Sequence, residues 1–215
     1  MEFRNLKPSD IELRVKTCKK GGTSFLLYKN ARCDMNVLDE SVGSSNWQRH
    51  HTRNNANCII SIWDEDKKQW IEKEDTGTET YSEKEKGIAS DSFKRAGFNW
   101  GIGRELYTAP FIYISSNILE VENYNGKYKP SGFPALRVSK VKTTKDKVIR
   151  QLEIRDKNDN VMYSWIDPRN KKLHSLIKKY SVEKVKKISE DNKISSVDIS
   201  YDELDTLENQ LKKEA

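Results

Sequence analysis

The chain has 215 residues, which is enough for one substantial hydrophobic core or for a main domain with a small appendage. Its 39 basic against 33 acidic residues give a net charge of +6, and this balance favours an acidic partner. No stretch approaches the roughly 20 apolar residues that cross a bilayer, and the amino-terminal residues lack the apolar segment of a secretory signal. Composition therefore predicts a protein that is neither exported nor embedded in a membrane.

The cysteines are Cys18, Cys33 and Cys58. They are odd in number and too widely spaced for a C-x-x-C metal knuckle. Reduced thiols in a cytosolic protein account for this pattern, and no zinc site is predicted.

The first forty residues are predicted to form two helices with a strand between them. Pro8 suits a first helical turn, and apolar residues recur at helical spacing from there to the Gly-Gly pair. The segment SFLLY, residues 24–28, predicts a short strand. A second helix is expected over 34–42, with Asp34 as its N-cap and Gly43 as its end.

A basic cluster, WQRHHTRNN, is predicted as a loop after the second helix. Arg49 and Arg53 are candidate contacts for nucleic acid there, and the alternative is an ordinary solvated loop. Adjacent histidines could bind a metal, but His50 and His51 point to opposite faces of an extended chain. Neither has a cysteine or an acid at ligand spacing, so no metal site is predicted.

Residues 57–75 have the pattern of an antiparallel hairpin. NCIISIW alternates and is rich in β-branched residues, DEDKKQ is a polar turn, and WIEKED is the partner strand. We expect a meander that reaches TGTETY at 76–81. Asp64 to Lys67 can be fitted to the acid-x-Lys pattern of metal-dependent nucleases, but such nucleases need carboxylates held on neighbouring strands, not in a turn.

The segment SEKEKGIASDSFKRAGFNWGIGRELY, residues 82–107, predicts a helix over 83–100. Ser82 and Glu85 form an S-x-x-E capping box at its start. A stripe of alternating small and large side chains would pack on a sheet: Ala89, Phe93, Ala96 and Trp100. The opposite half carries Lys84, Asp91, Lys94, Arg95 and Phe98.

The exposed half of this helix allows two interpretations. Lys94 and Arg95, with an aromatic one turn on, are what sequence-tolerant binding of single-stranded nucleic acid needs. Basic residues on an exposed helix face are, however, usually just solvated, and Asp91 can pair with Arg95 at i, i+4. Helical spacing alone leaves both interpretations open.

Two glycines, Gly101 and Gly103, follow the helix. A phosphate loop instead precedes a helix, so that the helix amino terminus faces the anion. These glycines therefore predict a helix end in the left-handed conformation. The pattern G-x-x-x-x-G-K-[ST] does not occur in the chain, and ATP hydrolysis is not expected.

Beyond residue 108 the sequence predicts strands and then helices. The strand candidates are APFIYI, PALRVSKV, VIRQLEIRD and NVMYSWI, and residues 115–134 are predicted as a loop. From Arg169 to Lys187 there are eight Lys or Arg and one acid, and a basic amphipathic helix is expected. From Ile188 to Ala215 there are three Lys and eight acids, with leucines spaced for a short acidic helix.

With these motifs placed, the chain resembles the phage single-strand annealing proteins of the Sak type, relatives of the eukaryotic Rad-fifty-two recombination mediator. The resemblance is carried by LLYKNARCDMNVLDESVGSSNWQRHH, CIISIWDEDKKQWIEKEDTGTE and EKEKGIASDSFKRAGFNWGIGRELYTAPF. It runs from about residue 3 to 165 for the phage proteins and over 6–107 for the eukaryotic relative. The most specific motif is D-x-x-K-R-A followed by an aromatic-Gly pair, here Asp91 to Gly101.

The resemblance implies an α+β fold with a β-β-β-α core, in which an antiparallel meander packs on a helix and subunits assemble into a ring or a filament. Residues 1–168 would form the annealing and oligomerisation domain, with the core at about 6–107 and added strands over 108–168, and 169–215 a charged helical tail. Single-stranded DNA would lie in a positive groove, and complementary strands would anneal without ATP, a cofactor or a catalytic residue. The expected setting is phage recombination and repair in the cytoplasm of a bacterial host cell, and candidate further partners are a host single-strand binding protein and a phage exonuclease.

Position by position, Lys94 and Arg95 match the basic pair that lines the DNA groove, and Arg32 matches its other basic contributor. The further candidates for DNA contact are Lys84, Arg49 and Arg53. The eukaryotic relative has an aromatic where this chain has Ser44 and a third arginine where it has Phe98. Phe98 is therefore expected either to stack on DNA or to pack at an interface.

Two alternatives belong to other functional classes. One is a Mg²⁺-dependent nuclease that uses the acidic turn at Asp64. The other is an adaptor whose basic helix, around residues 169–187, binds RNA or another protein. The same helix could extend the DNA path or be a solvated amphipathic helix, and the acidic stretch after it could dock a partner or cover a subunit edge.

Overall fold

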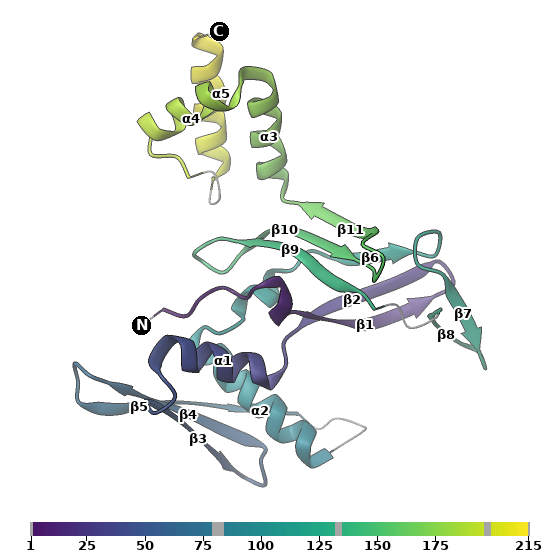
Figure 1. Ribbon diagram of the computed structural model, residues 1–215, viewed down its shortest axis with the longest axis vertical. Helices are drawn as coiled ribbons and strands as arrows, with labels where there is room; N and C mark the ends of the chain where they lie inside the picture. The colour runs from purple at the N-terminus through teal and green to yellow at the C-terminus, as the bar shows by residue number, and fades with distance from the viewer. Residues whose placement is uncertain (1, 79–83, 132–134, 196–198, 215) are drawn as a thin grey trace.

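The computed structural model describes residues 2–78, 84–131, 135–195 and 199–214, without the side chains of residues 84–86. The described residues form a mixed α+β structure with three three-stranded sheets, one two-stranded sheet and five α-helices. Every strand pair is antiparallel. The sheets and helices succeed one another along the long axis of the molecule, with the last three helices at one end (Figure 1).

The amino-terminal segment is a hairpin, and the predicted first helix is wrong. A single 3₁₀ turn at Pro8–Asp10 leads into β1 (Glu12–Lys19), which pairs with β2 (Gly22–Tyr28). Two residues join these strands, and β2 also pairs with β6 (Ile112–Ser115). The apolar residues that predicted one helical face do not lie on one buried surface. Ile11 is buried, whereas Val15 is 46% exposed.

Helix α1 (Ala31–Val42) confirms the second predicted helix but begins earlier than expected. Its N-cap is Asn30, whose side chain accepts the backbone N–H of Cys33, and not Asp34. Asp34 is instead fully buried in the first turn. The end at Gly43 is confirmed, with a φ of 84° that favours glycine.

The expected meander is present and gains a strand. β4 (Asn57–Asp64) pairs on one side with β5 (Gln69–Thr76) and on the other with β3 (Trp47–Thr52). The predicted loop WQRHHTRNN is therefore an edge strand in its first six residues, because β4 offers a free edge for pairing. His50 and His51 do point to opposite faces, since neighbouring residues of a strand alternate.

Helix α2 (Lys84–Trp100) packs on this meander (Figure 1). Phe93 and Ala96 are fully buried, Ala89 and Trp100 are half-buried, and the Trp100 indole N–H donates to the carbonyl of Ile60 at 3.0 Å. The predicted core stripe is thus confirmed. The helix ends at Gly101 and Gly103, whose φ angles are 98° and 78° as expected. The predicted capping box involves Ser82, which lies outside the described residues.

The predicted later strands are confirmed. After the 3₁₀ helix η2 (Arg104–Thr108) come β6, β9 (Arg137–Thr143), β10 (Ile149–Arg155) and β11 (Val161–Ile166), and the last three form one sheet. The predicted loop over 115–134 instead contains the hairpin β7 (Val121–Tyr124) and β8 (Lys127–Pro130). Its two-residue turn is Asn-Gly with both φ angles positive, the strongest short hairpin signal in a sequence.

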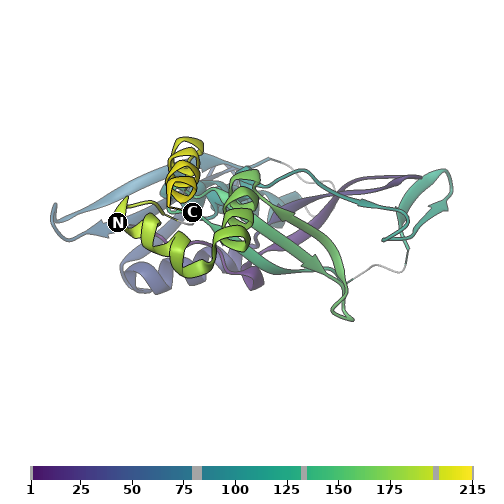
Figure 2. The same cartoon turned by 90° about the horizontal axis from the view of Figure 1, so that it is seen from above.

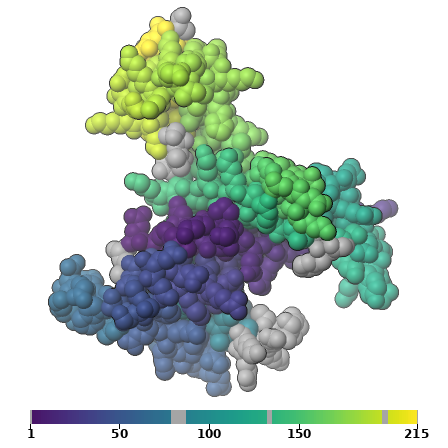
Figure 3. Space-filling model, viewed as in Figure 1, coloured from purple at the N-terminus to yellow at the C-terminus, as the bar shows by residue number. Residues whose placement is uncertain are grey.

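The carboxyl-terminal residues form a three-helix unit with its own hydrophobic cluster. The predicted basic helix is two helices, α3 (Pro168–Tyr180) and α4 (Val182–Asp191), separated at Ser181 with φ 76°. The predicted acidic helix is α5 (Tyr201–Lys213). The buried residues of this unit are Leu173, Leu176, Val185, Ile188, Ile199, Leu204, Leu207 and Leu211. Figure 3 shows the unit as a distinct mass beyond the β9–β11 sheet.

Two hairpins project to opposite sides of the molecule, β4–β5 on one side and β7–β8 on the other (Figure 2). Within the described ranges, no helix combines the length and the apolar character that a bilayer crossing requires.

Candidate nucleic-acid interface

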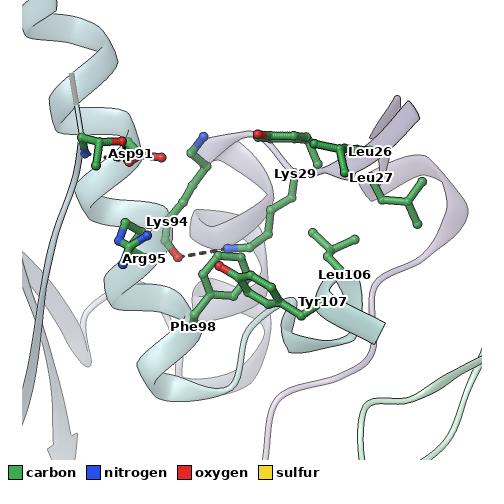
Figure 4. A pocket seen from close by; sticks show the side chains of 11 residues that line it. Leu26, Leu27, Lys29, Asp91, Lys94, Arg95, Phe98, Leu106 and Tyr107 are labelled. Atoms are coloured by element: carbon green, nitrogen blue, oxygen red, sulfur yellow. Dashed lines mark hydrogen bonds between the residues drawn. The ribbon is translucent and has the colours of Figure 1, made fainter. Parts of the chain in front are cut away.

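Lys94 and Arg95 lie on the side of α2 that is not packed on the meander core, and both line one cavity. The cavity measures about 320 Å³ and lies between α2, the end of β2 and η2 (Figure 4). Its wall combines cations, aromatic rings and aliphatic side chains. The fold thus brings this basic pair together with residues from two segments that are distant in sequence.

The two cations of this pair differ in their partners. Arg95 Nε lies 3.4 Å from Asp75 Oδ1 on β5, whereas Asp91 accepts the backbone N–H of Thr78 at 2.9 Å. The helical Asp91–Arg95 pair that the spacing allowed is therefore absent. Lys94 forms no ion pair with any described residue, and its ammonium lies 5.9 Å from the centre of the Tyr28 ring. Lys94 is the cation of the pair that is available to a phosphate.

A buried ion pair contributes to the wall of the cavity. The Lys29 ammonium donates to Asp34 Oδ1, and the two side chains are 1% and 0% exposed. Lys29 also donates to the backbone carbonyl of Lys94 at 3.4 Å (Figure 4). This pair therefore connects the end of β2, the first turn of α1 and the middle of α2, and it fixes where the backbone of Lys94 lies.

Two glycines make room for the buried pair. A Cβ at Gly97 would lie 2.3 Å from Asp34 Oδ1, and a Cβ at Gly103 would lie 2.5 Å from Cε of Lys29. Both contacts are far shorter than van der Waals packing permits, so a side chain at either position would displace the pair. The close approach at Gly97 is thus toward a carboxylate and not toward the sheet.

Burial shifts the protonation of both partners. Loss of hydration raises the pKa of Asp34 to about 6, although the Lys29 ammonium opposes this shift. Loss of hydration also lowers the pKa of Lys29, against the attraction of Asp34. Asp34 Oδ2 has no hydrogen-bond partner among the described residues. The pair is therefore a buried polar feature whose charged forms are disfavoured by the loss of hydration.

Aromatic rings form the rest of the wall. The Phe98 ring lies 4.4 Å from the Lys29 ammonium and packs edge-on against Tyr107, with ring centres 4.9 Å apart. Tyr107 itself is 73% exposed. Phe98 therefore contacts a cation and a neighbouring ring of the same chain, and Tyr107 is the more exposed ring of the two.

The other predicted contacts lie outside this cavity. Arg32 is exposed in the first turn of α1, two residues before the buried Asp34. Arg49 lies on β3 with its guanidinium 5.0 Å from the Phe93 ring, and Arg53 is exposed in the β3–β4 turn. Lys84 is the first residue of α2, but its side chain lies outside the described part. Of the five predicted residues whose side chains are described, Lys94 and Arg95 are brought into one site.

The acidic turn has a structural role of its own. Asp64 accepts the backbone N–H groups of Asp66 and Lys67 at 3.1 and 3.0 Å, and these bonds keep the pKa of Asp64 below its usual range. Asp64 therefore caps the β4–β5 turn. In the part of the chain that the structure describes, no three His, Cys, Asp or Glu side chains are grouped so as to hold a metal ion.

Comparison of the chain with protein-family models, curated proteins and solved structures finds no match. The likeness to annealing proteins therefore rests on the sequence motifs. The arrangement can hold an anion at Lys94 beside aromatic rings. Such a combination suits the phosphate and base of a nucleotide.

Sequence reasoning missed Lys29, the burial of Asp34, and Tyr107. Lys29 directly follows an apolar strand. A single lysine in that position predicts a surface residue at the end of the strand, because lysines are seldom fully buried. Asp34 stands in the first turn of a helix, where acids are common for reasons of capping and the helix dipole. Gly97 inside a helix was the one available signal, because an interior glycine often marks a close approach.

Proposed function

We propose that the protein binds single-stranded DNA at Lys94 and Arg95 and anneals complementary strands without ATP, working as a homo-oligomer. One observation carries this proposal: Lys94 has no ion-pair partner among the described residues and stands at the rim of an aromatic-lined cavity. A cation left unpaired in this setting favours a phosphate, and the nearby rings favour a base.

The mechanism follows from many weak contacts. Each subunit neutralises phosphates through Lys94, supported by Arg95 and, by the resemblance, by Arg32. Contacts to phosphate set the affinity and its salt dependence but carry no sequence information. Repetition over subunits would hold a strand extended, and pairing with the complement supplies the driving free energy. The process needs no acid, base or nucleophile from the protein.

The test compares Lys94→Ala with wild type in single-strand binding and in annealing of complementary oligonucleotides without nucleotide. We expect weaker binding at every sequence and a slope of log affinity against log salt that falls by about one. Arg95→Ala is expected to have a smaller effect, because Arg95 is partly neutralised by Asp75. Lys67→Ala is the matched control, since Lys67 is an exposed lysine in the β4–β5 turn.

Unchanged binding of Lys94→Ala at moderate salt would contradict the site. Light scattering and electron microscopy of the same samples test the oligomer, and a monomer that ignores single-stranded DNA would instead support an adaptor. Incubation of labelled DNA with Mg²⁺ addresses the nuclease alternative, and cleavage that disappears in Asp64→Ala would overturn the proposal.

A further inference from the structure

Tyr107 is an exposed aromatic residue on a firmly held segment. Its 3₁₀ helix η2 is tied to the end of α2 because Arg104 donates to the carbonyls of Phe98 and Asn99 at 2.7 and 2.9 Å. The buried Glu105 accepts the backbone N–H of Leu6 at 2.6 Å and anchors the same turn to the amino-terminal segment. Tyr107 is therefore held in place by its backbone while its side chain is 73% exposed.

The cavity beside Tyr107 has the size and wall of a small-ligand site. Its volume of about 320 Å³ lies in the range of about 300–1,000 Å³ that is usual for such sites. Leu26 and Leu106 contribute apolar surface, and Phe98 supports the Tyr107 ring edge-on (Figure 4). A flat apolar group that enters the cavity would meet one aromatic ring that is otherwise exposed to water.

The charges around the cavity favour an anionic ligand. Among the side chains that the structure describes, Lys29, Lys94 and Arg95 line it together with a single acid, Asp91. Asp91 already accepts hydrogen bonds from Thr78, and Lys29 is neutralised by the buried Asp34. The unpaired charge at the rim is that of Lys94. A ligand with an anionic group next to a flat ring matches this order of groups.

We infer that the cavity takes one nucleobase of the bound strand, stacked on Tyr107, while the adjoining phosphate lies at Lys94. This inference rests on the proposed function, because it assumes that single-stranded DNA occupies this face. Stacking on an aromatic ring tolerates any base, so the cavity contributes affinity without selecting sequence. A base held there must leave the cavity before it can pair with a complement, which makes Tyr107 a determinant of annealing rate as well as of affinity.

The test compares how tightly wild type and Tyr107→Ala bind two kinds of single strand. Wild type and Tyr107→Ala are titrated with an oligothymidylate and with an oligonucleotide of the same length that carries abasic sites. Wild type is expected to bind the abasic strand about tenfold more weakly per occupied site than the ordinary strand. Tyr107→Ala is expected to bind both strands alike, and Tyr107→Phe is expected to behave as wild type because the ring remains.

Lys94→Ala separates this inference from the proposed function. It should weaken binding of the ordinary and the abasic strand by the same factor, because it removes a phosphate contact. The matched control is Tyr124→Ala on β7, another exposed tyrosine beside a lysine, with Lys129 4.6 Å from its ring. This tyrosine lies on the distant β7–β8 hairpin (Figure 1), and its loss should change neither titration.

If Tyr107→Ala weakens the two strands equally, or weakens neither, the base is not stacked there and the inference is wrong even where Lys94→Ala behaves as proposed. If Lys94→Ala changes neither strand, the proposed function fails as well. A fluorescent base analogue gives a second readout, because its emission should be quenched on binding to wild type and not on binding to Tyr107→Ala. Unchanged thermal unfolding of Tyr107→Ala confirms that each comparison is made on folded protein.

Discussion

Helices α1 and α2 meet around a buried ion pair, whereas α3, α4 and α5 meet around eight buried apolar side chains. In the first region Lys29 and Asp34 are almost fully shielded from water, with two glycines packed against them. In the second region the charged partners stay on the surface, where Lys172 lies 2.8 and 3.0 Å from Asp205 and Glu208. The same residue types thus occupy opposite environments in the two regions.

The two environments differ in the geometry that they require of their side chains. Apolar packing of amphipathic helices is tolerant of substitution and stabilises without strict geometry. A buried ion pair loses hydration and contributes little net stability, but its hydrogen bonds are directional. Lys29 donates to both Asp34 and the carbonyl of Lys94, so this directional element lies beside the backbone of Lys94. The three-helix unit has no comparable demand on its geometry.

The largest expected effect is that of Lys29→Met. It leaves the Asp34 carboxylate buried without its partner, and we expect the free energy of unfolding to fall by about 3–5 kcal/mol. Urea unfolding followed by circular dichroism measures this loss. A loss below about 1 kcal/mol would show that the pair is not buried in solution as it is in the structure.

The double variant Lys29→Met with Asp34→Leu tests whether the loss of stability comes from the unpaired carboxylate. Because both charges are removed together, most of the lost stability should return. If the double variant also anneals DNA as well as wild type, the pair does not position Lys94, and the contrast between the two regions is one of stability alone.

The next effect is that of Leu207→Ala in α5. Leu207 is fully buried in the carboxyl-terminal cluster, and its truncation should destabilise the three-helix unit by about 2–5 kcal/mol. Single-strand binding at Lys94 should persist, because the cavity is built from other elements. Lys172→Ala is the surface control and should lower the unfolding temperature far less than Leu207→Ala does, because an ion pair at the surface contributes only about 0–1 kcal/mol. Loss of binding in Leu207→Ala would mean that the two regions do not act independently.

The smallest effect is a difference in pH dependence. The pKa of Asp34 is raised from its ordinary 3.8 to about 6, so the folded state binds a proton more tightly than the unfolded state. Its contribution is therefore most favourable below about pH 4 and is lost as the pH rises to about 6. The difference between these two pKa values corresponds to a fall of at most about 3 kcal/mol in the free energy of unfolding, at about 1.4 kcal/mol per pKa unit. Asp34→Asn should lack this fall in unfolding free energies measured from pH 4 to 7.

The carboxyl-terminal unit should respond with the opposite sign. Hydrogen bonds from Lys212 and Lys172 lower the pKa of Glu208 from 4.5 to about 2, so its pairing stabilises above pH 4.5 and is lost in acid. As the pH falls, a probe near Asp34 should therefore report rising stability between about pH 6 and pH 4, and a probe in the three-helix unit should report falling stability between about pH 4.5 and pH 2. Equal slopes in wild type and Asp34→Asn would place Asp34 in contact with water.

Much of the fold was predictable because local signals and packing agreed. The stripe of Ala89, Phe93 and Ala96 identified the buried face of α2, and alternation in NCIISIW identified β4. The predictions were wrong in segments where strand pairing, and not the short local sequence pattern, determined the structure. Residues 12–19 and 47–52 form strands because each lies next to a free strand edge, which is a property of the assembled sheet. The β7–β8 hairpin was missed although its Asn-Gly turn was visible in the sequence.

By itself the sequence determined the α+β character, the amphipathic faces of the main helices, the helix end at Gly101 and the choice of Lys94 and Arg95 as candidate contacts. These follow from spacing within one segment, which local geometry translates directly into faces and ends. Only the tertiary fold buries Lys29 and Asp34 together, holds Arg95 next to Asp75, and brings Tyr107 and Lys94 into the lining of one cavity. These are contacts between segments far apart in the chain, and only the packing of those segments brings such residues within reach of one another.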